Sequence, residues 1–347
     1  MERLNYFVRR LVLIIPTFIG ITLVCFGITQ CVPGGPVEQM VMQMKGIGSG
    51  ESRLVAGAVT AITADQRRAM ERHFGFDKPL HVRYWHWLVR DRMGMAMQSY
   101  KYPDKTAWQI IRQRMPVSLL FGIAGFLTTY LVCIPLGIAK ALRHGSRFDF
   151  VSSILVFAGY ALPTFAFGMV LRMLLCGTVD SLWDVFPLTG WQSDTFAALP
   201  LLARIGDIAW HMALPVLCYV IGNFAVLTIL TQNALLEQIG RDYMRTVIAK
   251  GGTLRRAVWG HALRNAMIPV VTGIGGILTV MFAGSVIIEQ VFEIPGMGRL
   301  GLESIVGRDY AVFMGILSLT SILGLLGNIL SDFCYVLIDP RINFNRR

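Results

Sequence analysis

The residues of this chain that could do chemistry are its lysines, histidines and acidic groups, and none of them falls into a catalytic pattern. A P-loop requires a Gly-Lys-Ser/Thr run after a glycine-rich turn, and no lysine here follows a glycine. His81 and His86 lack the further ligands that a metal site needs. The sequence has no H-E-x-x-H motif, nucleophile elbow or paired-carboxylate arrangement. We therefore expect no active site, no metal and no bound cofactor on this chain.

The most informative polar segment is the loop of residues 237–266. It contains amphipathic helical sequence that is interrupted by Gly251 and a second glycine. Because glycine adopts positive φ at little cost, we predict a sharp turn here between two short helices. Tyr243, Val247 and Ile248 lie beside Arg241 and Arg245, and such a mixed face suits docking into a groove of another protein. A basic amphipathic loop resting on anionic lipid is the alternative that these residues leave open.

The elements that must position this loop are apolar. Hydrophobic residues make up 54% of the 347-residue chain and charged residues only 15%, against roughly a quarter in soluble proteins. A helix needs about 20 residues to cross the hydrocarbon of a bilayer. Charge-free runs of at least that length occupy residues 11–37, 115–139, 150–171, 208–236, 265–288 and 310–331. We predict an all-α polytopic membrane protein with six transmembrane helices, kinked at Pro135, Pro163 and Pro215.

The distribution of positive charge predicts the orientation of these helices. Lysine and arginine are concentrated at the N-terminus, in the short loop after Ala139, in residues 237–266 and in the C-terminal tail. Such residues are retained in the cytoplasm, so both termini are expected there. The net charge of +11 fits loops held at an anionic leaflet better than a nucleic-acid partner.

The predicted organisation has three parts. Residues 1–37 are the cytoplasmic N-terminus and first helix, residues 38–114 form a small external subdomain, and residues 115–347 form the core with helices two to six. A capping box at Thr63–Gln66 predicts a short helix in the external subdomain, whose later aromatics favour the membrane interface. The cysteines are expected to be buried thiols, although Cys31 and Cys176 could approach each other.

An ordered series of motifs resembles the inner-membrane permeases of ABC importers, in their peptide branch. The run Asp242-Tyr-Met-Arg-Thr-Val-Ile-Ala-Lys-Gly251, followed by His261-Ala-Leu-Arg-Asn265 and Pro269, is similar to the EAA-type loop of that family. It departs from the family at Val247 and Ile248, where alanine and arginine are usual. The similarity extends over nearly the whole chain and is carried by Phe74–Pro79, Glu289–Gly298, Arg308–Tyr310 and Asp339–Arg341. Gly145-Ser-Arg-Phe-Asp149, among other segments, resembles most the Yej-type permeases of peptide and microcin C importers.

The resemblance implies a fold, a function and a set of partners. The fold would be that of a type I ABC importer permease in the bacterial inner membrane. The chain would be a non-catalytic permease subunit that pairs with a second homologous permease as a heterodimer. Two ABC ATPase subunits would hold ATP and Mg²⁺, and an extracytoplasmic solute-binding protein would deliver a peptide or peptide-like compound. Nickel or another small solute is the alternative cargo, and a stand-alone channel or carrier, or a receptor or scaffold, are the alternative functions.

Two groups of residues are the candidate sites. For coupling to the ATPase the resemblance implies Arg245, Thr246, Val247, Ile248, Ala249, Lys250 and Gly251, with Gly251 as the hinge. An external gate is suggested by the acid and turn residues after the fifth run, namely Glu289, Phe292, Pro295 and Gly296. A purely structural re-entrant turn is the alternative for this second group.

Overall fold

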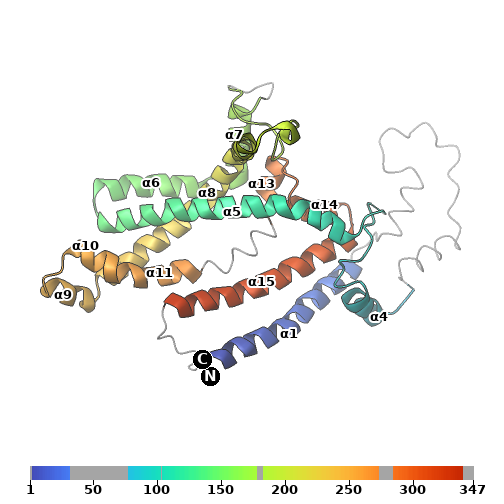
Figure 1. The fold of residues 1–347 in the computed structure, drawn as a ribbon, viewed down its shortest axis with the longest axis horizontal. Coiled ribbons are helices and arrows are strands. Elements are labelled where there is room, and N and C mark those ends of the chain that lie inside the picture. Colours follow the sequence, from blue (N-terminus) through green and yellow to red (C-terminus); the bar gives the residue numbers. More distant parts are fainter. Residues whose placement is uncertain (1, 32–76, 103, 178–182, 273–283, 339–347) are drawn as a thin grey trace. The chain divides into compact units, whose positions relative to one another are not determined.

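The computed structural model describes the chain except for residues 1, 32–76, 103, 178–182, 273–283 and 339–347, and the described part is helical (Figure 1). No strand occurs in the described ranges, which hold only isolated bridges between Gln98 and Thr106 and between Cys176 and Phe186. The helices are α1 (Glu2–Cys31), α4 (Leu80–Trp85), α5 (Ala107–Leu142), α6 (Arg147–Ala161), α7 (Thr164–Leu175), α8 (Leu201–Ile239), α9 (Asp242–Ala249), α10 (Leu254–Ala257), α11 (Leu263–Thr272), α13 (Val286–Val291), α14 (Met297–Val306) and α15 (Tyr310–Ile338). Short π-helical turns cover His86–Arg90 and Val258–Ala262, and a 3₁₀ turn covers Phe196–Ala198.

Four of the described helices are long and apolar enough to cross a membrane. These are α1, α5, α8 and α15, and they match the first, second, fourth and sixth predicted runs. The middle of the fifth predicted run, residues 273–283 of 265–288, lies outside the described residues, so that span is not described as one helix. The predicted capping box at Thr63–Gln66 and the Asp339–Arg341 motif also lie outside them.

The third predicted span is not one straight helix. It consists of α6 and α7, which meet at an angle of 92°, so the pair is a broken span or a re-entrant segment. The break falls at Leu162, which is extended with φ −83° and ψ 125°, and at Pro163. A residue before proline is pushed out of the α region, and proline has no N–H to donate. By contrast, α5 and α8 continue through Pro135 and Pro215.

The described chain forms two compact units, each with its own packing. The larger unit comprises Met1–Ile14, Arg114–Arg299 and Ile322–Arg347, and the smaller comprises Ile15–Gln113 and Leu300–Ser321. Glycines bring α5 and α8 close together in the larger unit. A Cβ at Gly137 would lie 2.6 Å from Thr231 Cβ, and one at Gly125 would lie 2.7 Å from Tyr219 Cδ1. Small residues let helix backbones approach in this way inside membranes.

The core of the larger unit is apolar. One cluster of buried residues joins α5, α8 and the segment around α13 through Val117, Phe121, Cys176, Met212, Leu214, Cys218, Ile288, Phe292 and Ile294.

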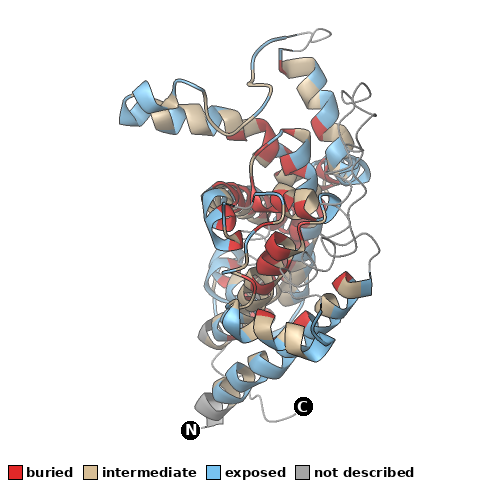
Figure 2. Ribbon diagram, turned by 90° about the vertical axis from the view of Figure 1, so that its right-hand side faces the viewer, coloured by how far each residue is buried: buried red, intermediate tan, exposed pale blue. Residues whose placement is uncertain are grey.

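Cys176 is fully buried, whereas Cys31 at the end of α1 is exposed, and both thiols are free. Figure 2 shows that α1 is pale blue over most of its length; its large apolar side chains Leu11, Ile15 and Val24 are about half exposed or more. Such a surface suits contact with lipid.

The smaller unit contains aromatic residues in two different environments. Trp87 is buried and packs beside the rings of Phe26 and Tyr84. Tyr84 also bonds through its hydroxyl to Thr22 Oγ1 at 2.9 Å. Trp85 and Trp108 are exposed, which is the arrangement expected of aromatics at a membrane interface.

Candidate functional site

The first candidate site is a helical hook, which consists of α9, the turn at Gly251 and Gly252, and α10. Asp242 opens α9 with a negative charge in the first turn, where it complements the helix dipole. Gly251 has φ +84°, and its N–H donates to Ile248 O at 2.9 Å. Thr253 then caps α10 by accepting a hydrogen bond from the Arg256 N–H. The predicted sharp turn between two short helices is confirmed.

Each glycine of the turn is required for a different reason. At Gly251 a side chain would meet nothing within 4 Å, but the positive φ strains every L residue to some degree. At Gly252 a Cβ would lie 2.8 Å from Val247 O, so a side chain there collides with α9 itself. The turn therefore fixes the angle between α9 and α10 and leaves Gly251 open at the tip.

The inner side of the hook is fastened to the ends of two long helices. Met244 is 1% exposed and lies in a cluster with Ile138 and Ala141 of α5 and Leu235 of α8. Residues 257–266, including Ala257, Val258, Ala262 and Ala266, complete that cluster. Apolar burial therefore packs the hook against the ends of both helices.

Polar contacts support the same attachment. The Tyr243 hydroxyl donates to Gln238 Oε1 at 3.0 Å and accepts a hydrogen bond from Asn265 Nδ2 at 3.4 Å. The sequence predicts that Tyr243, Val247 and Ile248 face a partner together, but Tyr243 and Val247 are half-buried against the cluster. Tyr243 and Val247 therefore contribute mainly to the fixed side of α9.

The outer side of the hook is exposed and mixed in character. Ile248 is 47% exposed and Leu254 55%, and Arg245, Lys250 and Gly251 are exposed beside them. The Arg245 side chain approaches Asp242 only at 3.8 Å, in a pair that water surrounds. Leu254 was missed by the sequence reasoning; its position directly after the capping threonine of α10 was the available signal.

The second candidate site is the Glu289 loop, residues 284–299. Glu289 is completely buried, and its Oε1 accepts hydrogen bonds from Ser118 Oγ at 2.9 Å and from the Ser285 N–H at 3.3 Å. Its Oε2 accepts from the Arg299 N–H at 2.8 Å. Ser118 Oγ also accepts from the Met297 N–H at 2.6 Å, so the loop is tied to α5 at two points.

Glycines make room for this buried carboxylate. A Cβ at Gly284 or at Gly296 would overlap the Glu289 carboxyl group. Of the other predicted gate residues, Phe292 is buried and Pro295 is half-buried. The four residues thus lie in one packed loop, and the carboxylate closes that loop rather than facing open space. A role as an external gate stays a prediction.

The other two charges that flank the predicted spans also have local partners. Arg172 of α7 donates to Val291 O at 2.6 Å and to Glu293 Oε1 at 2.8 Å. Asp332 of α15 pairs with Arg10 of α1. Both charges are therefore paired within the described part of the chain.

A third polar centre, which the sequence reasoning did not single out as a site, surrounds Asp309. Its carboxylate accepts hydrogen bonds from Ser99 Oγ, from the Tyr100 N–H at 3.2 Å and from the Val312 N–H at 3.3 Å. It therefore caps α15 and holds the loop before α5. Burial, with the Asp309 carboxylate as a second cause, raises the pKa of the Tyr100 hydroxyl.

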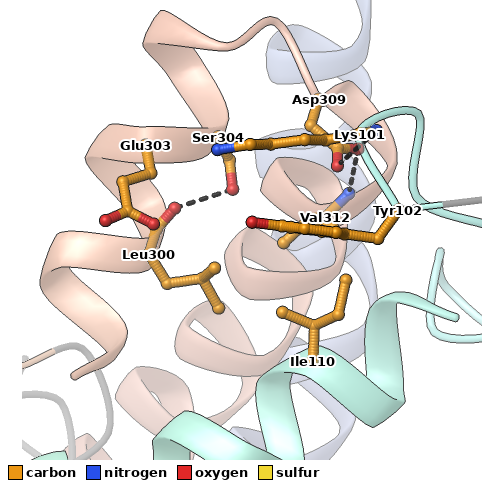
Figure 3. A pocket seen from close by; sticks show the side chains of 8 residues that line it. All are labelled: Lys101, Tyr102, Ile110, Leu300, Glu303, Ser304, Asp309 and Val312. Carbon is orange, nitrogen blue, oxygen red and sulfur yellow. Dashed lines mark hydrogen bonds between the residues drawn. The ribbon is translucent and has the colours of Figure 1, made fainter. Parts of the chain in front are cut away.

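A shallow pocket adjoins the Asp309 centre. Figure 3 shows its lining side chains, which come from the loop before α5, from α5 and from α14 and α15: Lys101, Tyr102, Ile110, Leu300, Glu303, Ser304, Asp309 and Val312. Tyr102 and Leu300 give the pocket apolar walls. The Ser304 hydroxyl donates a hydrogen bond to Leu300 O at 2.7 Å. Nothing in this lining resembles a catalytic arrangement.

The fold and the hook together define a class of protein: a helical membrane component whose exposed polar element is fixed to the ends of its spans. Comparison with known proteins identifies the class further. Residues 133–344 match the family model of the binding-protein-dependent transport system inner membrane component, so the chain belongs to that family. It is accordingly a membrane permease subunit, not a catalytic one.

The relatives are similar over the whole chain. The inner membrane ABC transporter permease protein YejB of Escherichia coli O157:H7 is 38% identical, with 99% of each chain covered. The peptidoglycan transport system permease protein YejB of Agrobacterium fabrum is 37% identical, again with 99% of each covered. The dipeptide transport system permease protein DppB of Escherichia coli K12 is 34% identical, with 99% of this chain and 100% of the relative covered.

Proposed function

We propose that this chain is the transmembrane permease subunit of an ATP-driven importer that moves peptides or peptide-like compounds across the bacterial inner membrane. The family assignment and the relatives named for dipeptide and oligopeptide transport support peptide cargo over nickel or another small solute. The observation that carries the mechanism is the hook, which is fastened to α5 and α8 on one side and exposed on the other.

The proposed complex contains four kinds of subunit. This permease pairs with a second homologous permease, and each binds one ABC ATPase subunit through its hook. The ATPase subunits bind ATP and Mg²⁺, and an extracytoplasmic binding protein delivers the cargo. The hook then lies in the cytoplasm, as do both termini, in keeping with the positive charge of residues 237–266.

The exposed face of the hook suits a groove on an ATPase subunit. Ile248 and Leu254 supply apolar anchors, and Arg245 and Lys250 supply positive charge around them. Short amphipathic helices bind grooves in this way, through apolar anchors with a polar rim. Closure of the two ATPase subunits would displace the hooks, and the attached spans would switch between inward-facing and outward-facing states.

The open tip of the hook provides the test. Gly251→Asp adds a charged side chain where the chain itself leaves space, so the free subunit should still fold and insert. Peptide-stimulated ATP hydrolysis in the reconstituted complex should be abolished, because the tip no longer fits its groove. Gly251→Asn separates size from charge, since asparagine tolerates the left-handed backbone.

A second glycine of the same loop serves as the control. Gly260 is exposed, and a Cβ added there would also meet nothing within 4 Å, but it lies outside the hook, so Gly260→Asp should keep stimulation. Unchanged stimulation in Gly251→Asp would remove the hook from the mechanism. Peptide uptake by vesicles that contain the permease without ATPase subunits would instead establish a stand-alone carrier.

A further inference from the structure

A buried lysine joins three helices next to the hook. Lys140, near the end of α5, is 1% exposed. Its Nζ lies 2.8 Å from Asp149 Oδ1 and 3.0 Å from Asp149 O, both at the start of α6. It also donates to Ser152 Oγ at 3.1 Å and to Ser153 Oγ at 2.6 Å in the next turn of α6. The ammonium group is thus surrounded by acceptors of one neighbouring helix.

The carboxylate of Asp149 extends the network to a third helix. Gln232 of α8 donates from Nε2 to Asp149 Oδ1 at 3.0 Å. The Gly145 N–H donates to Oδ2 at 3.1 Å, and His144 Nδ1 lies 3.2 Å from the same oxygen at the exposed rim. The Asp149 carboxylate therefore joins three elements: the turn between α5 and α6, the start of α6, and α8 at Gln232, about two turns before that helix ends.

The buried ion pair of Lys140 and Asp149 contributes more to the relative position of α5, α6 and α8 than to the stability of the fold. A buried ion pair gains little over well-packed apolar residues, because both charges lose their hydration. Removing one partner, however, leaves an uncompensated buried charge. The pair consequently holds α5, α6 and α8 in one relative position and strongly disfavours intermediate ones.

The network lies directly behind the attachment of the hook. Lys140 is between Ile138 and Ala141 of α5, and Gln232 lies one turn before Leu235 of α8; these three apolar residues belong to the cluster that buries Met244 of the hook. The ends of α5 and α8 that pack in the cluster with the hook therefore also hold Asp149 of α6. A displacement of α5 and α8 must carry α6 with it or break the pair.

We propose that Lys140, Asp149 and Gln232 form a positioning element that passes the movement of the hook to α6 and, through it, to the bent α6–α7 segment. This inference rests on the proposed docking of the hook to an ATPase subunit. The coupling path then runs through a buried charge pair, and α6 moves with α5 and α8 as one body.

The test uses the complete importer in proteoliposomes, with ATP hydrolysis and peptide uptake measured together. Lys140→Met combined with Asp149→Asn removes the ion pair without leaving a buried charge, so the complex should assemble and keep its basal ATP hydrolysis. Peptides imported per ATP hydrolysed should fall about tenfold, a value within the range typical of coupling between sites. Arg147→Met removes an exposed positive charge from the same region and should leave the ratio unchanged.

A second variant keeps the inference testable if the double variant does not assemble. Gln232→Met removes only the α8 contact and leaves the ion pair, and a roughly fivefold loss of the ratio is expected, at the low end of allosteric coupling. A normal ratio in the variant that assembles would overturn the positioning element. If Gly251→Asp still abolishes stimulation in that case, the docking of the hook stands and only the inferred path is wrong.

Discussion

Replacing Met244 by alanine should release α9 from the long helices. Met244 is the one buried residue of α9, and its side chain fills the cluster formed with Leu235 and Val258. An isolated helix of eight residues is marginal in water, so tertiary packing determines whether α9 stays in place.

The magnitude follows from the burial of the side chain. Truncating a buried methionine to alanine costs about 2–5 kcal/mol, through lost apolar burial and the cavity that remains. If the residues around the hook relax into part of that cavity, a loss of about 2–3 kcal/mol remains, which multiplies the ratio of released to attached α9 by roughly 30 to 150. The shift should be largest in the hook, because α9 has no second buried residue, whereas the rest of the cluster keeps its other packing partners.

Hydrogen exchange measures this release directly. In the purified Met244→Ala subunit, amides in and after α9, such as Lys250, which donates to Thr246 O, should exchange faster, while those of α8 should not change. Peptide-stimulated ATP hydrolysis in the complex should fall. Ile248→Ala is the matched control: Ile248 is 47% exposed, so its loss should leave exchange unchanged and weaken only the binding of the ATPase subunit. Equal exchange in the native chain and in Met244→Ala would refute the packing argument.

Two further predictions concern the polar centres outside the hook. Asp309→Ala leaves Ser99 Oγ and the Tyr100 N–H without their acceptor, so the free energy of unfolding should fall by about 1–3 kcal/mol. A lower melting temperature of the subunit would show this loss. Alanine at the exposed Asp104 is the control and should have no effect. Glu289→Gln should destabilise the Glu289 loop by a similar amount, about 1–3 kcal/mol, because an amide nitrogen would face backbone donors. Normal uptake per folded Glu289→Gln complex would dismiss a direct gating role for that charge.

The helical spans could be predicted from the sequence because composition alone specifies them. Charge-free runs of sufficient length located α1, α5, α8 and α15, although the helices extend past the ends of those runs. The break between α6 and α7 was expected only as a kink. Proline at 163 ends a helix and proline at 135 does not, although both residues look alike in the sequence. What differs is the packing around each proline, which a single sequence does not contain.

The sequence predicts the backbone turn of the hook, but it does not predict which side of α9 packs against the long helices. Two consecutive glycines between amphipathic runs indicate a turn, and Gly251 indeed has positive φ. Which side of α9 is fixed depends on residues far away in the sequence, such as Leu235 and Ile138. The apolar residues Met244, Val247 and Ile248 could not be divided between the attached and the exposed side without them.

The buried charges of the larger unit explain how a short displacement of the hook could act on distant loops. Ser118 and Lys140 both belong to α5, and 22 residues of helix between them span about 33 Å, close to the thickness of the hydrocarbon layer. Ser118 ties one end of α5 to the Glu289 loop, and Lys140 ties the other end to α6. Between these ties α5 packs closely on α8, against the Tyr219 side chain at Gly125 and against Thr231 and the Thr228 carbonyl at Gly137. In the proposed mechanism, α5 would carry a movement of the hook from Lys140 to Ser118 and the Glu289 loop, without requiring any charge in the middle of the membrane.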